Sequence, residues 1–124
     1  MFVLVRRVDL ADVIGAALVW KASGAGARSI AARLARPVDT VRGWLRRFER
    51  RAEHICVYFT VLLVDTGVDP IPPALAPTPF AQAVSAVIGA WRAAVSRWPD
   101  IGKVSPWQAA SAASGGRLLS PIWP

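Results

Sequence analysis

The chain has 124 residues and a formal net charge of +7, with arginine supplying most of its basic residues. This length suits one domain with a modest core, and the arginine excess favours nucleic acid as the partner, because guanidinium groups bind phosphate oxygens bidentately. A single cysteine, Cys56, and a single histidine, His54, exclude an internal disulfide and the usual zinc sites, so we expect no metal, cofactor or small-molecule substrate.

The first predicted elements are short. Residues 1–8 contain a β-prone stretch without clear context, which we interpret as an N-terminal stub. Asp9 or Asp12 is suited to cap a first helix that ends near Ala22. A second helix is predicted at 27–34, and Pro37 fits the first turn of a third helix, where its missing N–H is not needed. We assign residues 9–50 to one domain.

The third helix is predicted to be long and to extend through 51–66. Its apolar residues recur at alternating intervals of four and three: Val41, Leu45, Phe48, Ala52, Ile55, Phe59 and Leu62. This spacing produces a continuous apolar stripe, whose second half needs a packing partner outside the 9–50 domain. The apolar run Ile55–Val64 is only about half of what a helix needs to cross a bilayer, so we expect a soluble protein. The single cysteine favours a reducing, cytoplasmic setting.

Prolines interrupt the chain at 67–79 and predict a semi-rigid linker. A fourth helix is predicted at 80–98, with an apolar stripe of the same heptad spacing. The stripes at 52–62 and 80–98 suggest an antiparallel helical pair, formed within one chain or across a homodimer. The tail at 99–124 offers one short helix and exposed tryptophans, and we expect it to be ordered only if it docks.

The stretch at 26–48 carries the functional content. Two short helical patterns meet at an Ala-Arg-Pro turn, which is typical of a helix-turn-helix. At 100° per residue, Val41, Trp44, Leu45 and Phe48 share the core-facing side of the second helix, and its other sides are basic. We therefore predict an all-α fold: a tri-helical helix-turn-helix domain with an extended third helix and an additional C-terminal helix.

Residues near the start of a recognition helix reach deepest into the major groove of double-stranded DNA. Val38 suits a thymine methyl, Asp39 suits cytosine N4, and Arg42 or Arg46 suits guanine. The predicted DNA-binding residues are Arg28, Arg33, Arg36, Val38, Asp39, Thr40, Arg42, Gly43, Arg46, Arg47 and Arg50. If about four arginines neutralise phosphates, log affinity falls with log salt at a slope near −3.6.

Two alternatives stay open. Arg46–Glu49 and Arg50–Glu53 are i,i+3 pairs, so the basic face is also compatible with ordinary solvated charge on a helical oligomerisation or protein-interaction module. A basic helix followed by an apolar run is also compatible with an anionic membrane surface. Because no spaced acidic set suggests two-metal chemistry, we expect no catalysis.

Three stretches together resemble a known group of proteins: ADVIGAAL, GARSIAARLARPVDTVRGWLRRF and SAASGGRLLSPIWP. They are similar to actinobacterial helix-turn-helix proteins of the homeodomain-like, transposase-associated kind. The resemblance implies a tri-helical DNA-binding fold, a recognition segment at 38–47 and a nucleoid location. The chain departs from this group by lacking an N-terminal four-cysteine zinc ribbon, and by placing Ala35 where the turn usually has glycine, which tolerates a left-handed conformation better.

Overall fold

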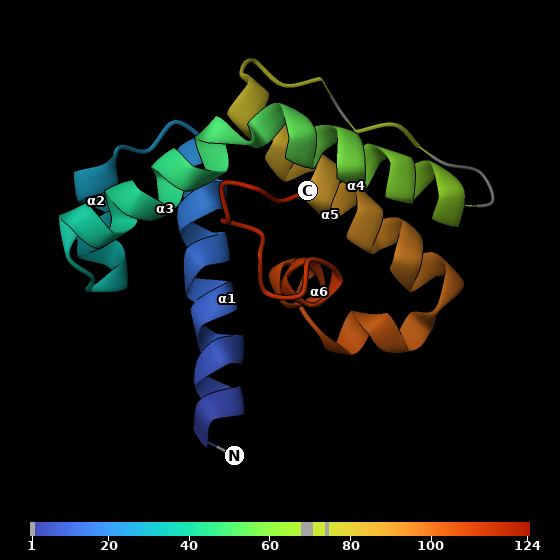
Figure 1. Ribbon diagram of the computed structural model, residues 1–124, viewed down its shortest axis with the longest axis horizontal. Helices are drawn as coiled ribbons and strands as arrows, with labels where there is room; N and C mark the ends of the chain where they lie inside the picture. Colours follow the sequence, from blue (N-terminus) through green and yellow to red (C-terminus); the bar gives the residue numbers. More distant parts are fainter. Residues whose placement is uncertain (1, 68–70, 74) are drawn as a thin grey trace.

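The computed structural model describes residues 2–67, 71–73 and 75–124, with side chains from residue 10 onward. The described chain is all-α, as predicted, and contains α1 (Phe2–Ala22), α2 (Ala27–Leu34), α3 (Val38–Arg50), α4 (Ala52–Thr66), α5 (Pro79–Arg97), the 3₁₀ helix η1 (Pro99–Lys103) and α6 (Pro106–Ala113). Figure 1 shows α2 and α3 beside one end of the long α1, and α4 and α5 beyond it, with α6 against α1 and α5. One hydrophobic cluster includes buried residues from all six α-helices.

The predicted N-terminal stub and the predicted helix cap at Asp9 or Asp12 are wrong. Helix α1 begins at Phe2, so residues 2–8 form its first turns and neither Asp9 nor Asp12 occupies a cap position. The Asp12 carboxylate instead accepts hydrogen bonds from the Ser105 hydroxyl and, at 2.7 Å, from Gln108 Nε2. The same two residues form the capping box that begins α6. Asp12 therefore joins α1 to α6, a role that depends on a partner more than ninety residues away in the chain.

The predicted long third helix is divided into α3 and α4 at Arg51. The backbone there has φ −113° and ψ 11°, and the Arg51 N–H donates to the Phe48 carbonyl at 3.2 Å, three residues back. Beyond the break the apolar spacing changes, since Leu63 is buried while Leu62 is 37% exposed. Alternating intervals of four and three therefore predict the buried side correctly only as far as Phe59. Among the described residues, no helix combines the length and the apolar character that crossing a membrane requires.

Helices α4 and α5 pack on each other in parallel, contrary to the predicted antiparallel pair. Near the start of α4, the Phe80 ring in the first turn of α5 lies 4.9 Å from the ring of Phe48, which belongs to the last turn of α3. At their last turns, an Arg97 guanidinium nitrogen donates to the Thr66 carbonyl at 3.3 Å. Extended, proline-rich backbone covers about 3 Å per residue, so a linker at 67–79 is long enough to span the length of α4, which a parallel pair requires. Residues 68–70 and 74 of the linker lie outside the described residues.

The α4–α5 pair occupies the stripes that also suggested a homodimer. Ile55, Phe59 and Leu63 of α4 are at most 3% exposed, and Val84 and Val87 of α5 are at most 5% exposed. The helices approach closely, because a Cβ built on Gly89 would lie 3.0 Å from Leu63 Cδ1. The intrachain pair therefore covers most of these stripes, while Leu62 and Trp98 are 37% and 50% exposed.

The C-terminal tail docks on the rest of the protein. Trp107 of α6 is 7% exposed, and its ring lies against Gly15 of α1. The Trp123 ring contacts Tyr58 and Phe59 of α4, with ring centroids 4.8 and 6.0 Å apart. The expectation of exposed tryptophans in the tail is therefore wrong for Trp107.

Candidate nucleic-acid interface

The turn between α2 and α3 has a left-handed residue at its first position. Ala35 adopts φ 52° and ψ 46°. Its N–H donates to the Ala32 carbonyl at 3.4 Å, and the Arg36 N–H donates to the Ala31 carbonyl at 3.1 Å. This is a Schellman motif, in which glycine is the usual left-handed residue. Pro37, with φ −57° and ψ 140°, is the N-cap residue that precedes α3, so it lies just before the first turn in which it was expected. Three residues, 35–37, therefore connect the two helices.

Packing fixes the orientation of α3 about its own axis. Val41 and Phe48 are fully buried, and Trp44 and Leu45 are 7% exposed, which confirms the predicted core-facing side. Ile30 and Ala31 supply the buried side of α2. With four large side chains enclosed, the remaining sides of α3 must face solvent.

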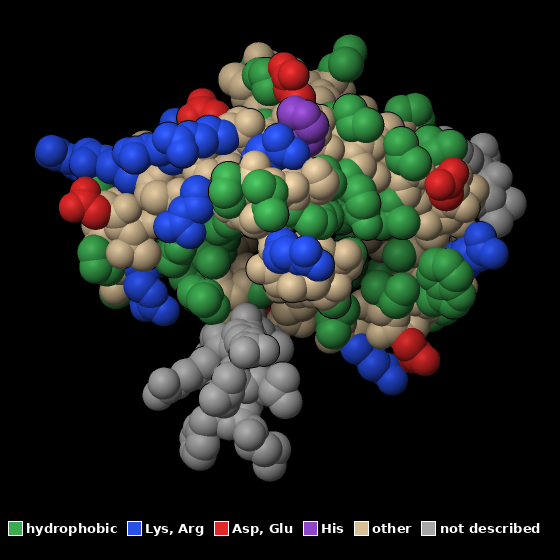
Figure 2. Space-filling model, in the orientation of Figure 1, with side chains coloured by type: hydrophobic (Ala, Val, Ile, Leu, Met, Phe, Trp, Pro, Cys, Tyr) green, Lys and Arg blue, Asp and Glu red, His purple; other side chains and the backbone are tan. Residues whose placement is uncertain are grey.

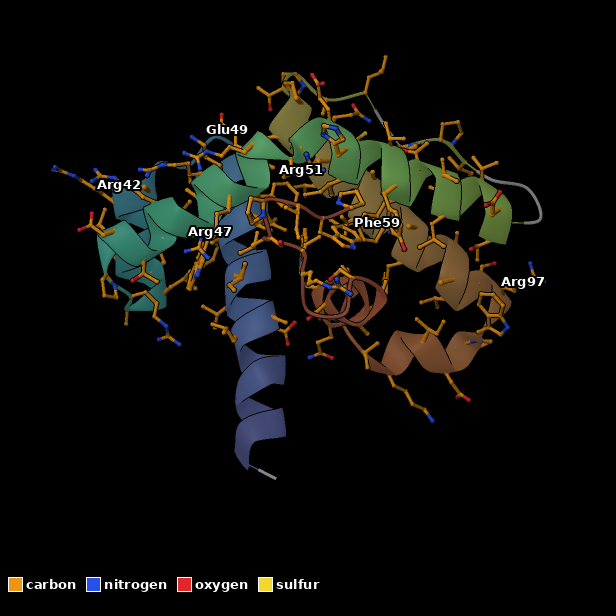
Figure 3. All side chains as sticks on the ribbon, viewed as in Figure 1. Arg42, Arg47, Glu49, Arg51, Phe59 and Arg97 are labelled. Atoms are coloured by element: carbon orange, nitrogen blue, oxygen red, sulfur yellow. The ribbon has the colours of Figure 1, made fainter. Side chains whose placement is uncertain are left out.

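The predicted DNA-binding residues lie on this outward surface. Val38 and Gly43 are half-buried, and the other nine are exposed: Arg28, Arg33, Arg36, Asp39, Thr40, Arg42, Arg46, Arg47 and Arg50. Figure 2 shows Lys and Arg side chains gathered at the end of the molecule formed by α2 and α3. In Figure 3, Arg42 and Arg47 lie at this end, and Arg97 lies at the opposite end of the molecule. We call the surface formed by these eleven residues the basic face.

Three arginines of the basic face have partners within the protein, and one of them, Arg36, donates from Nη1 to the Leu34 carbonyl at 3.5 Å. The Arg33 guanidinium lies 5.2 Å from the ring centroid of Trp20, a cation–π contact that joins α2 to α1. Arg42 Nη1 lies 3.8 Å from Asp39 Oδ1, with the side chains 47% and 98% exposed. Such an exposed pair is worth little in stability, because water and salt screen it. Arg42 therefore stays available to a ligand that displaces Asp39.

The two i,i+3 ion pairs that the sequence permits on the basic face, Arg46–Glu49 and Arg50–Glu53, do not form. Among the described side chains, ion pairs join Arg42 to Asp39 and Lys103 to Asp100. Neither Arg46–Glu49 nor Arg50–Glu53 comes within 4.0 Å. Arg46 and Arg50 consequently keep their guanidinium donors directed to solvent on the outward side of α3.

Both helices of the basic face begin without a side-chain cap. Gly26 precedes α2 and Pro37 precedes α3, and neither supplies a capping oxygen. The first backbone N–H groups of each helix are therefore open to an anion, which the helix dipole also favours. Thr40 lies in the first turn of α3, as predicted for a phosphate contact. Ser29 was missed by the sequence reasoning; it is exposed in the first turn of α2, and its position there is the signal that identifies it.

Gly43 is less open than the sequence suggests. A Cβ built on Gly43 would lie 3.2 Å from a terminal guanidinium nitrogen of Arg47. The Arg47 side chain therefore folds back across Gly43, and the bare backbone is reached only when this flexible side chain moves.

The described residues offer little other chemistry. No three His, Cys, Asp or Glu side chains among them lie close enough to share a metal ion. Cys56 is half-buried, with its sulfur 4.0 Å from the Thr60 hydroxyl. Comparisons with protein-family models, curated proteins and solved structures found no match to this chain. The resemblance to transposase-associated helix-turn-helix proteins stays a prediction.

Proposed function

We propose that this protein binds double-stranded DNA sequence-specifically through a helix-turn-helix formed by α2 and α3, with α1 completing a tri-helical unit. The observation that carries the proposal is the outward side of α3. Packing of the opposite side holds Arg42, Arg46 and Arg50 in one exposed row. The proposed role is that of a regulator or mobile-element accessory without catalysis of its own.

Helix α3 is the recognition helix in this proposal. An α-helix fits the major groove, and its first turns lie closest to the base edges. Asp39 and Arg42 lie in these turns, and Arg46 lies one turn further along the same side. An arginine reads guanine bidentately and an aspartate accepts from cytosine N4, so the row favours G·C pairs.

Helix α2 and the turn position the recognition helix. Arg28 is exposed in the first turn of α2 and Arg36 in the turn that follows this helix, and both helix starts offer backbone N–H groups without a side-chain cap. Phosphate contacts of this kind fix the register of a protein on DNA without reading its sequence. Arg33 is already ordered by Trp20, so it loses little side-chain entropy when a phosphate binds beside it.

The test compares two double variants that remove the same charge. Arg42→Ala with Arg46→Ala removes two groups of the outward row. Arg92→Ala with Arg117→Ala removes two exposed arginines from α5 and the tail. Because alanine is the best helix former, the α3 variant keeps its helix. Affinity is measured by fluorescence anisotropy at several salt concentrations, on a site selected from random DNA.

The expected result is a loss of about tenfold or more in affinity for the α3 variant, because a bidentate base contact is worth roughly 1–3 kcal/mol. The control should retain affinity within about threefold, because non-contacting charges act only through screened long-range attraction. Equal binding and an equal salt slope for the α3 variant and the parent would refute the recognition-helix role. Selection that enriches no sequence would refute sequence-specific binding.

One observation favours the alternative function of a helical interaction module. Val57, Val61 and Val64 on α4 are each more than half exposed. If the α3 double variant leaves DNA binding unchanged while substitution of these valines changes self-association, the interaction module is the better description and the basic face is incidental.

A further inference from the structure

The outward side of α4 forms an open groove of about 660 Å³. Its lining residues are Glu53, His54, Val57, Tyr58, Val61, Leu62, Asp65 and Pro124. The middle is apolar, with Val57 62%, Val61 54% and Leu62 37% exposed. Leaving valine and leucine this exposed along one helix is costly in water, so the groove is suited to a partner that covers it.

The α4 groove has different groups at its two ends. Glu53 and His54 lie in the first turn of α4 and Asp65 lies in the last, so both ends of the groove carry a carboxylate and the first end alone carries an imidazole. Imidazole N–H groups donate to carboxylates. A helix with a donor at one end and an acceptor at the other complements a copy of itself only when the copy runs in the opposite direction. A parallel copy would place Asp65 beside Asp65 and His54 beside His54.

We propose that a second copy of this chain occupies the groove, with its α4 antiparallel to the first. In the matching register, His54 of one protomer lies opposite Asp65 of the other, and Val57 lies opposite Leu62. Tyr58 and Val61 face each other across the centre. Each contact occurs twice, as a two-fold axis requires. This dimer uses a different side of α4 from the stripe that packs on α5, and it does not depend on DNA binding.

The size of the α4 groove sets the expected strength of the dimer. A single pair of 15-residue helices lies at the small end of interfaces that form stable complexes. We therefore expect a dissociation constant on the order of 1–100 μM. Dimers of this strength are measurable by sedimentation equilibrium of the full chain at concentrations up to roughly 200 μM, about twice the upper end of that range.

Val61→Glu tests the apolar centre of the groove. A carboxylate there would be buried in the apolar centre opposite Tyr58 and near its two-fold copy, which raises the dissociation constant more than about tenfold. Leu75→Glu is the matched control, since Leu75 is 98% exposed and outside the groove. It introduces the same charge and should leave dimerisation unchanged. Circular dichroism of each variant verifies that its helices are intact.

A charge exchange tests the direction of the second helix. His54→Asp alone places two carboxylates together at each end and weakens the dimer. His54→Asp with Asp65→His restores the same pair with its members exchanged and recovers the parent dissociation constant within about threefold. A parent that is monomeric at roughly 200 μM overturns the proposal, as does a dimer unaffected by Val61→Glu. Failure of the exchange to restore association overturns the antiparallel register.

Discussion

Replacing Gly15 by alanine sets helix propensity against packing. Gly15 lies in the middle of α1, where alanine is favoured over glycine by about 1 kcal/mol. The ring of Trp107 from α6 lies directly against the Gly15 backbone, and a Cβ built there would overlap ring atoms Cγ and Cδ1. Trp107 is 7% exposed, so the ring has little room to move aside. The two effects have opposite signs, and the structure decides which is larger.

The packing term exceeds the propensity term. Forcing an extra methyl into a filled core costs roughly 1–3 kcal/mol. If the ring is expelled instead, the loss approaches the roughly 3–5 kcal/mol that removal of a buried tryptophan side chain costs. Subtracting about 1 kcal/mol of propensity gain leaves a net loss in the free energy of unfolding of up to about 2 kcal/mol if the ring shifts within the core, and of about 2–4 kcal/mol if the ring is expelled.

Urea unfolding followed by circular dichroism measures this loss without depending on tryptophan environment. The control is the same substitution in a Trp107→Ala background, where the ring is absent. There the change to alanine should stabilise the protein by about 0.5–1 kcal/mol, because only propensity remains. The sign therefore reverses between the two backgrounds. If Gly15→Ala is as stable as the parent in the presence of Trp107, the close contact of α1 and α6 is refuted.

Three further substitutions test the local geometry. Ala35→Gly should raise the free energy of unfolding by about 0.5–1 kcal/mol, because glycine removes the left-handed strain of roughly 1–2 kcal/mol but increases the entropy of the unfolded chain. Thermal denaturation measures this gain, and an unchanged Tm would argue against a left-handed residue at position 35. Asp12→Ala should lower the free energy of unfolding by about 2 kcal/mol, since the two partly buried hydrogen bonds that the carboxylate accepts are lost. A double-mutant cycle with Gln108→Ala should show coupling, and strict additivity would contradict the contact between Asp12 and Gln108. Gly43→Ala should stabilise α3 by up to about 1 kcal/mol, as urea unfolding measures, because the Arg47 side chain can move away from the new methyl group. The same substitution should reduce DNA affinity several-fold in the anisotropy assay if the Gly43 backbone approaches the DNA groove, and unchanged affinity would exclude that approach.

Local signals predicted much of the fold. Helices α2 and α5 begin and end within about one residue of expectation. The starts of α3, α5 and α6 carry local signals, since Pro37 precedes α3 and the side chains of Thr78 and Ser105 cap α5 and α6. The buried side of α3 also follows from residue spacing alone. The parallel direction of α5 did not follow, since a linker's composition indicates its stiffness but not the helix face to which it returns the chain.

The break at Arg51 and the role of Asp12 depend on contacts between distant residues. The Arg51 guanidinium donates to the carbonyl oxygens of Trp123 at 3.1 Å and Pro124 at 3.3 Å, and Arg51 itself is an ordinary helix former. Nothing in its neighbours along the chain marks a helix end. Trp98, the last residue of the apolar stripe predicted at 80–98, is 50% exposed, with the Arg97 guanidinium 4.9 Å from its ring centroid.

Within the basic face, spacing predicted which residues are exposed but not how their side chains lie. The i,i+3 positions of Arg46 and Glu49 permit an ion pair that does not form, whereas Asp39 and Arg42 have the same spacing and do pair. Long side chains at a surface choose among rotamers of similar energy, so sequence spacing permits a contact without requiring it. The fold of Arg47 across Gly43 is a choice of the same kind.

The two proposals together make a prediction about DNA sites. Helix α4 has 15 residues and is about 22 Å long, so an antiparallel α4 pair places the two ends nearest α3 about that far apart. Half of the 13-residue α3 adds up to about 10 Å on each side, so the recognition-helix midpoints lie roughly 22–42 Å apart. This range includes the roughly 34 Å between successive major grooves on one side of B-DNA.

Selection from random DNA should therefore yield inverted repeats with half-sites centred about ten base pairs apart for the parent. Val61→Glu, which separates the protomers, should yield single half-sites of the same sequence. Recovery of the inverted repeat by Val61→Glu would show that the α4 groove does not set the spacing, even if α3 reads the DNA. Loss of all enrichment in both proteins would instead reject the basic face as the DNA-reading surface, and would leave dimerisation through α4 to be judged by sedimentation alone.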